Sequence, residues 1–169
     1  EMCIRDSYSH NPSRKLFKQV VSWLKRKGFH FISADTLYEI LIKKIPIPKK
    51  AVFLSLDDGW KENYSQLVPL IHAKQLPVTI FISTEPVFNR DRYWWSYIEK
   101  AKQKKCVKYS VNELKKIPDI QRRHILEKAR RVVSVRREAM LPEEVIALKN
   151  KKVIIGSHTI SHPILTMCT

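Results

Sequence analysis

The sequence predicts an α/β fold in which short buried strands form a parallel sheet or barrel. Four short apolar runs of strand character alternate with longer segments whose apolar residues recur at helical spacing. The chain has 169 residues, of which 44% are hydrophobic, so it is long enough to bury a core. Both motifs that carry chemical groups directly follow a predicted strand. In α/β folds, functional residues project from the carboxyl ends of strands.

The N-terminal part of the fold is predicted to contain a helix, a short strand and a second helix. Ser13 is a suitable N-cap for the first helix, and Gly28 ends it. Residues 29–32 are a short strand candidate. Ser33 caps the second helix, which ends before Pro46 because proline cannot continue a helix.

Three more strands are predicted further along the chain. Residues 51–56 and 78–83 are apolar runs of the kind that a strand buried on both faces requires. Residues 153–156 form the last strand. Between the first two, residues 61–74 have an apolar stripe at helical spacing and predict a helix with a kink at Pro69.

The formal charge of +16 is concentrated in one part of the chain. Residues 100–152 contain 17 Lys or Arg and 6 Asp or Glu, within a predicted basic insertion of two or three helices at about residues 90–150. Such a surface attracts anionic partners, but a solvated helical face is the simpler interpretation. The predicted domain covers residues 8–169, and residues 1–7 are expected to lie outside the fold.

Other features exclude several classes of protein. The three cysteines, Cys3, Cys106 and Cys168, have no CxxC spacing, which argues against a disulfide framework or a cysteine metal site. No apolar run is long enough for a transmembrane segment, and no signal peptide is visible. The residues predict neither the compartment nor the oligomeric state.

The first chemical motif is Asp57-Asp58-Gly59, at the end of a predicted strand. Two adjacent carboxylates repel each other unless a cation shares them. A metal ion bound by one carboxylate would relieve that repulsion and leave the other as a general base. Gly59 removes a side chain where a ligand approaches the backbone. A solvated turn is the alternative interpretation of this motif alone.

The second motif runs from His158 to Pro163 and contains two histidines separated by three residues. In a turn after a strand, His158 and His162 can face one metal ion. Pro163 disfavours a helical conformation at His162, so we expect a turn. The hydroxyls of Thr159 and Ser161 are candidates to orient the rings. Two unrelated surface histidines are the alternative.

Tyr93, Trp94 and Trp95 form an aromatic cluster in the sequence. Such a cluster can stack on sugar rings, but aromatic side chains more often close a core, and we favour the core interpretation.

The two motifs resemble those of the polysaccharide deacetylase family, the NodB-homology domain of carbohydrate esterase family 4. Its first motif, Thr-Phe-Asp-Asp-Gly, is similar to residues 55–59, which read Ser-Leu-Asp-Asp-Gly. Its second, His-Ser/Thr-x-x-His-Pro, is matched in full by residues 158–163. Residues 17–37 and 77–83 are also similar to the family. The resemblance implies an incomplete (β/α) barrel of the glycoside hydrolase/deacetylase type.

The resemblance implies a metal-dependent hydrolase that removes N- or O-acetyl groups from a polysaccharide or other glycan. Asp57 would be the general base, and Asp58, His158 and His162 would bind one divalent metal ion, usually zinc. The ligand types suit zinc without excluding cobalt, nickel or iron. The family's Arg motif and its Leu-x-His segment with the acid histidine do not occur after His162. We therefore expect the front part of a longer enzyme, with little activity as a separate chain.

Three alternatives remain open at this point. The chain could be a basic module that binds an anionic polymer, although no recognised nucleic-acid motif is present and no specific nucleic acid is expected as a partner. It could be a non-catalytic fragment or relative that retains the metal. A metal phosphoesterase could also use two histidines and an aspartate, although Asp57-Asp58-Gly59 is less typical of that class.

Overall fold

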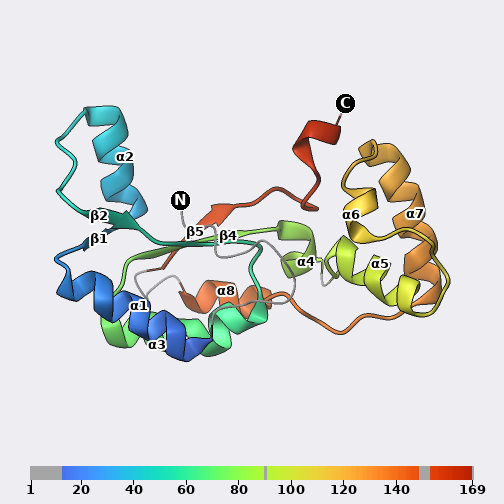
Figure 1. Cartoon of the computed structure of the whole chain (residues 1–169), viewed down its shortest axis with the longest axis horizontal. Coiled ribbons are helices and arrows are strands. Elements are labelled where there is room, and N and C mark those ends of the chain that lie inside the picture. The colour runs from blue at the N-terminus through green and yellow to red at the C-terminus, as the bar shows by residue number, and fades with distance from the viewer. Residues whose placement is uncertain (1–12, 90, 149–152, 169) are drawn as a thin grey trace.

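A computed structural model of the chain describes residues 13–89, 91–148 and 153–168 (Figure 1). The expectations for residues 1–7 and for Cys3 fall outside these ranges. In the described part of the chain, no helix combines the length and the apolar character needed to cross a lipid bilayer.

Among the described residues the named strands pair in the parallel sense, as predicted, and form two small sheets, while an isolated bridge between Trp60 and Ala139 is antiparallel. One sheet pairs β1 (His30–Ile32) with β2 (Ala51–Phe53). The other contains β3 (Ser55–Leu56), β4 (Val78–Ile82) and β5 (Val153–Ser157), with β4 in the middle. The single strand predicted over residues 51–56 is therefore divided, and the chain passes from one sheet to the other there.

The predicted α/β class is confirmed, but the described residues do not form a closed barrel. Closing a barrel requires each strand to pair with a neighbour on both sides. β2 and β3 belong to different sheets, and the described chain between β4 and β5 forms helices and loops. The two sheets therefore remain separate.

The helices of the N-terminal half begin where the sequence predicts. α1 (Arg14–Arg26) starts at Ser13, whose hydroxyl oxygen accepts a hydrogen bond from Leu16 N at 3.1 Å. α2 (Ala34–Lys43) follows β1 and is capped in the same way by Ser33. The sequence thus fixes both helix starts through side chains that satisfy free backbone N–H groups.

The helix predicted over residues 61–74 is instead two elements. A π-helical turn, η1 (Asn63–Leu67), precedes α3 (Val68–Lys74), and Pro69 lies in the first turn of α3. Proline has no backbone N–H to donate, and the first turn of a helix is the position where that loss matters least. The predicted kink is therefore a change of helix type before Pro69.

Residues 90–150 contain more helices than the two or three that we predict. Four α-helices lie in the described part of this stretch, and α4 (Thr84–Phe88) precedes them: α5 (Trp94–Gln103), α6 (Val111–Leu114), α7 (Asp119–Val132) and α8 (Pro142–Leu148). A short 3₁₀-helix, η2 (Leu165–Met167), follows the second motif. In Figure 1, α5, α6 and α7 gather beyond the carboxyl ends of β4 and β5, whereas α8 lies along the sheet, where it contacts β5 and η1.

The core is continuous from the sheet into α5–α7. It includes buried residues of β4, of α1 and α3 beside the sheet, and of the helices beyond it: Val78, Ile80, Ile82, Phe17, Val21, Leu70, Ile71, Ile98, Leu114, Leu126 and Ala129. Tyr93, Trp94 and Trp95 belong to the same core, as the sequence favours. Most of the basic side chains of residues 91–148 are exposed, which agrees with a solvated face; buried Arg122 is an exception.

Gly59 is predicted to be essential to this packing. Its φ of +86° is unfavourable for a residue with a side chain, and an added Cβ would lie 2.9 Å from Ile82 Cγ2. We expect Gly59→Ala to lower the free energy of unfolding by about 2–4 kcal/mol, from backbone strain and overpacking together. Gly28 is a matched control, because its φ is +75° and an added Cβ would meet nothing within 4 Å.

Gly28→Ala should therefore lower the free energy of unfolding by the strain alone, about 1–2 kcal/mol. Urea unfolding of both variants measures the difference. Equal losses in the two variants would contradict the close packing of Ile82 against Gly59.

Candidate metal centre

Asp58 follows β3 and is held by Ser83, the residue directly after the central strand β4. Asp58 is 5% exposed and has a φ of +71°. Its carbonyl oxygen accepts hydrogen bonds from Ser83 N and from the hydroxyl of Tyr93, both at 3.1 Å. These two bonds fix an unusual backbone conformation, so the carboxylate has a defined direction.

His158 is attached to the same strand end as Asp58. Its backbone N–H donates to Ile82 O at 2.8 Å, which extends the pairing of β4 with β5 by one residue. Its carbonyl oxygen accepts a hydrogen bond from the hydroxyl of Ser83 at 3.1 Å. Ser83 therefore contacts the backbone of Asp58 and of His158, and it holds the two motifs at one edge of the sheet.

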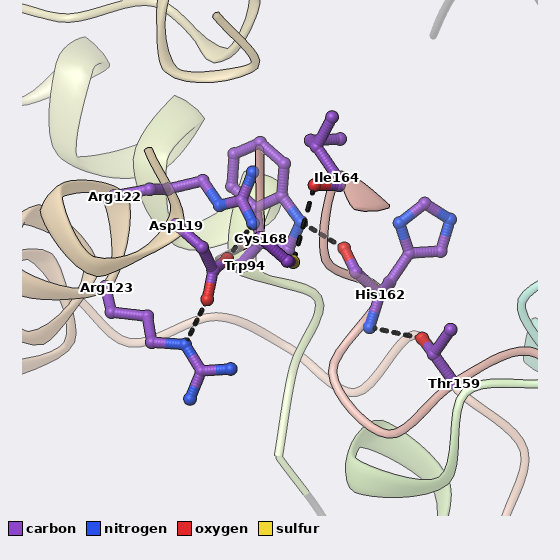
Figure 2. Close-up of polar contacts among 8 residues, drawn as sticks. All are labelled: Trp94, Asp119, Arg122, Arg123, Thr159, His162, Ile164 and Cys168. Atoms are coloured by element: carbon purple, nitrogen blue, oxygen red, sulfur yellow. Dashed lines mark hydrogen bonds and ion pairs between the residues drawn. The ribbon is translucent and has the colours of Figure 1, made fainter. Parts of the chain in front are cut away.

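His162 lies in a turn with two residues in the left-handed region, Thr159 at a φ of +67° and His162 at +53°. Figure 2 shows the two hydrogen bonds on its backbone: His162 N donates to the Thr159 hydroxyl at 3.0 Å, and Trp94 Nε1 donates to His162 O at 3.1 Å. The Thr159 hydroxyl thus bonds to the backbone of His162, whereas the sequence makes this hydroxyl a candidate to orient a ring. His162 is not helical, as expected, and residues 160–161 before it form a bend.

The three predicted ligands converge on one point. Asp58 Oδ1 lies 3.5 Å from His158 Nε2 and 3.2 Å from His162 Nε2, and one donor atom from each residue lies within 4.8 Å of the others. Ligand atoms about 2.0–2.1 Å from a tetrahedral zinc ion lie about 3.3–3.4 Å apart. The two nitrogen–oxygen distances therefore fit a shared ion.

The chemistry of the group also suits a cation. Both Nε2 atoms face the same oxygen of buried Asp58, and the centroids of the two imidazole rings are 4.8 Å apart. Nε2 of a neutral imidazole either donates a proton to that oxygen or, with the proton on Nδ1, offers its lone pair to a metal ion. One divalent ion satisfies all three groups, so Asp58, His158 and His162 could hold a divalent metal.

The second oxygen of Asp58 has its own partner. Trp60 Nε1 donates to Asp58 Oδ2 at 2.9 Å, which turns Oδ1 toward the two imidazoles. The Trp60 ring lies 4.3 Å from the ring of Tyr93, Tyr93 stacks on Trp95 at 4.8 Å, and Trp95 lies edge-on to His162 at 4.9 Å. A series of aromatic contacts therefore connects Asp58 to His162.

Asp57, the predicted general base, lies beside this group but is not part of it. Its side chain is exposed, and its carboxylate makes no hydrogen bond or ion pair with a residue in the described ranges. Its carbonyl oxygen accepts a hydrogen bond from Gly59 N at 2.9 Å, which closes the turn. The position next to Asp58 leaves the Asp57 carboxylate available to solvent, and its role stays a prediction.

Sequence reasoning missed several residues that hold the ligands. Trp60 and Trp94 each act through one indole hydrogen bond and Ser83 acts through two, and only the fold brings these contacts about. The sequence assigned Trp94 to the core alone. Trp60 was the easiest of the three to predict from the sequence, since it follows Asp57-Asp58-Gly59 directly. An indole N–H two residues from a ligand carboxylate is a signal that could have been used.

Comparisons with known proteins show the family to which the chain belongs. The polysaccharide deacetylase family matches residues 44–169. The poly-beta-1,6-N-acetyl-D-glucosamine N-deacetylase of Escherichia coli (strain K12) is 32% identical over 60 residues. That match covers 36% of this chain and 9% of the relative, so the chain spans only a small part of the relative's length.

Several solved structures are similar to the chain. IcaB from Ammonifex degensii has a TM-score of 0.47 and 16% identity, and the match covers 98% of this chain and 85% of that one. A de-N-acetylase from Aggregatibacter actinomycetemcomitans has a TM-score of 0.42 and 26% identity, and the match covers 47% and 30%. Because the family match extends over most of the residues, this chain belongs to the polysaccharide deacetylase family.

Proposed function

We propose that the chain carries the metal centre of a hydrolase that removes acetyl groups from a polysaccharide. The observation that carries the proposal is the convergence of Asp58, His158 and His162, within 4.8 Å of one another, in a member of the polysaccharide deacetylase family. The reaction adds water to the acetyl carbonyl, breaks the bond from that carbon to nitrogen or oxygen, and leaves acetate with a free amine or hydroxyl.

In this proposal the metal ion is zinc, bound by Asp58 Oδ1 and by Nε2 of His158 and His162. Two imidazoles and one carboxylate are a ligand set that zinc hydrolases use, with a further position left for water or substrate. Bound there, zinc supplies a Lewis acid that polarises a carbonyl and lowers the pKa of water. Trp60 keeps Asp58 Oδ2 occupied, so that Oδ1 stays directed at the imidazoles.

Asp57 is proposed as the general base. Its exposed carboxylate follows β3 directly beside Asp58, and it is not engaged by neighbouring side chains in the described ranges. It accepts a proton from the attacking water molecule at a carboxylate oxygen. Asp58 cannot take that part, because both of its oxygens already face other groups.

The substrate class follows from the family and from the curated relative. We propose an acetylated polymer of amino sugars, because the Escherichia coli relative is named for its action on poly-beta-1,6-N-acetyl-D-glucosamine. The +16 charge of the chain is consistent with a neutral acetylated polymer or an acidic one, and it disfavours binding of the cationic product that N-deacetylation leaves.

Metal binding is tested by titrating the metal-free chain with zinc. We expect one zinc ion per chain, and we expect His162→Ala to weaken binding at least a hundredfold because it removes a ligand. His124→Ala is the matched control, since His124 is exposed on α7 and outside the ligand group. It should leave the affinity unchanged. Equal zinc affinity in the two variants would refute the ligand assignment.

The role of Asp57 is tested with Asp57→Asn in the protein expressed from its complete gene. We expect kcat for acetate release from a β-1,6-linked N-acetylglucosamine oligomer to fall about 10²–10⁴-fold, because general-base catalysis has that magnitude. Zinc affinity should fall far less than in His162→Ala. Asp35→Asn, on the exposed face of α2, is the control. Unchanged kcat in Asp57→Asn would exclude Asp57 as the base, and release of phosphate from a phosphoester in place of acetate would overturn the proposed reaction.

A further inference from the structure

The basic helices α5–α7 lie within residues 93–140, and both ends of this segment contact the motifs that contain the proposed metal ligands. At the start of this segment, the Tyr93 hydroxyl donates to Asp58 O and Trp94 Nε1 donates to His162 O. At its other end, Met140 N donates to Gly59 O at 2.9 Å and Lys61 N donates to Glu138 O at 2.8 Å. The segment is therefore built into the site and is not an independent module attached to it.

The backbone at His162 needs support from outside its own turn. A residue with a side chain in the left-handed region is disfavoured by about 1–2 kcal/mol, and Thr159 and His162 both adopt it. The Thr159 hydroxyl supports the N–H of His162 from within the turn. The carbonyl oxygen of His162 is held by Trp94, which comes from α5, more than sixty residues earlier in the chain.

Trp94 is itself held in place by a buried arginine. The Arg122 guanidinium lies 4.9 Å from the centroid of the Trp94 ring, a cation–π contact. Arg122 is 3% exposed, and it pairs with Asp119 at the start of α7 (Figure 2). Arg123 pairs with the same carboxylate but is largely exposed, and no contact joins it to Trp94 among the described residues.

We propose that Trp94 is a positioning residue of the metal centre and that Arg122 fixes Trp94. The path runs from Asp119 through Arg122 and Trp94 to the backbone of His162, whose Nε2 faces Asp58 Oδ1 at 3.2 Å. Because the direction of an imidazole follows from its backbone, losing the Trp94 hydrogen bond lets His162 turn away from the shared ion. This inference rests on the proposed metal centre and assigns to the basic helices a role within it.

A purely structural role for Trp94 predicts a different outcome. Trp94 is 4% exposed, so its loss could reduce stability without any effect on the ligands. Trp94→Phe separates the two roles, because it removes the indole N–H and keeps an aromatic ring beneath Arg122. Trp23→Phe is the matched control, since Trp23 lies on α1 and is 48% exposed.

The experiment is a zinc titration of the metal-free full chain, with the cobalt(II) absorption spectrum as a second measurement. We expect Trp94→Phe to raise the zinc Kd about 10–100-fold, the effect typical of contacts that orient metal ligands. The visible bands of bound cobalt should also change, since they report ligand geometry. Trp23→Phe should alter neither. A lower thermal midpoint with unchanged zinc Kd and cobalt spectrum would overturn the proposal.

A second pair of variants tests the path even if Trp94→Phe does not fold. Arg122→Lys keeps the positive charge and removes the planar group over Trp94, so we expect the zinc Kd to rise several-fold. Arg123→Lys changes the other arginine on Asp119 and should leave the Kd within about twofold. Equal Kd values would contradict the role of Arg122. A wild-type chain that binds no zinc would instead refute the metal centre and, with it, this inference.

Discussion

The buried carboxylate of Asp58 between two imidazoles is the constraint on which the rest of the site depends. An ionised carboxylate with little access to water needs positively charged or hydrogen-donating partners. The fold places the Nε2 atoms of two imidazoles 3.5 and 3.2 Å from one oxygen of that carboxylate. One divalent ion can be bound by all three groups at once, which gives the arrangement a physical explanation as a metal centre.

The parallel sheet makes this convergence possible. Because β3 and β5 both pair with β4 in the parallel sense, their carboxyl ends meet at one edge, about a hundred residues apart in the chain. Ser83, directly after β4, bonds to the backbone of Asp58 and of His158. From the start of α5, Tyr93 bonds to the backbone of Asp58 and Trp94 bonds to the backbone of His162. A feature that composition presents as a solvated surface is therefore also a structural part of the site.

Much of this arrangement could be predicted from local chemistry. Ser13 and Ser33 determine two helix starts, and the apolar runs determine the strands that carry the motifs. The ligand group could also be predicted, because the carboxyl ends of neighbouring parallel strands meet at one edge of the sheet. What could not be predicted depends on contacts between distant segments: the division of residues 51–56 between two sheets, the separation of α8 from α5–α7, and the hydrogen bonds of Ser83 and Trp94. The alternation of strands and helices left a parallel sheet or a barrel open, the resemblance implied an incomplete barrel, and no pattern in the residues specified how the sheets would close.

The most direct test of the central claim is anomalous diffraction at the zinc absorption edge from crystals of the zinc-loaded chain. The account predicts one strong peak, about 2.0–2.2 Å from Asp58 Oδ1 and from Nε2 of both His158 and His162. A zinc peak bound by other residues, with Asp58 paired directly to protonated histidines, would contradict it.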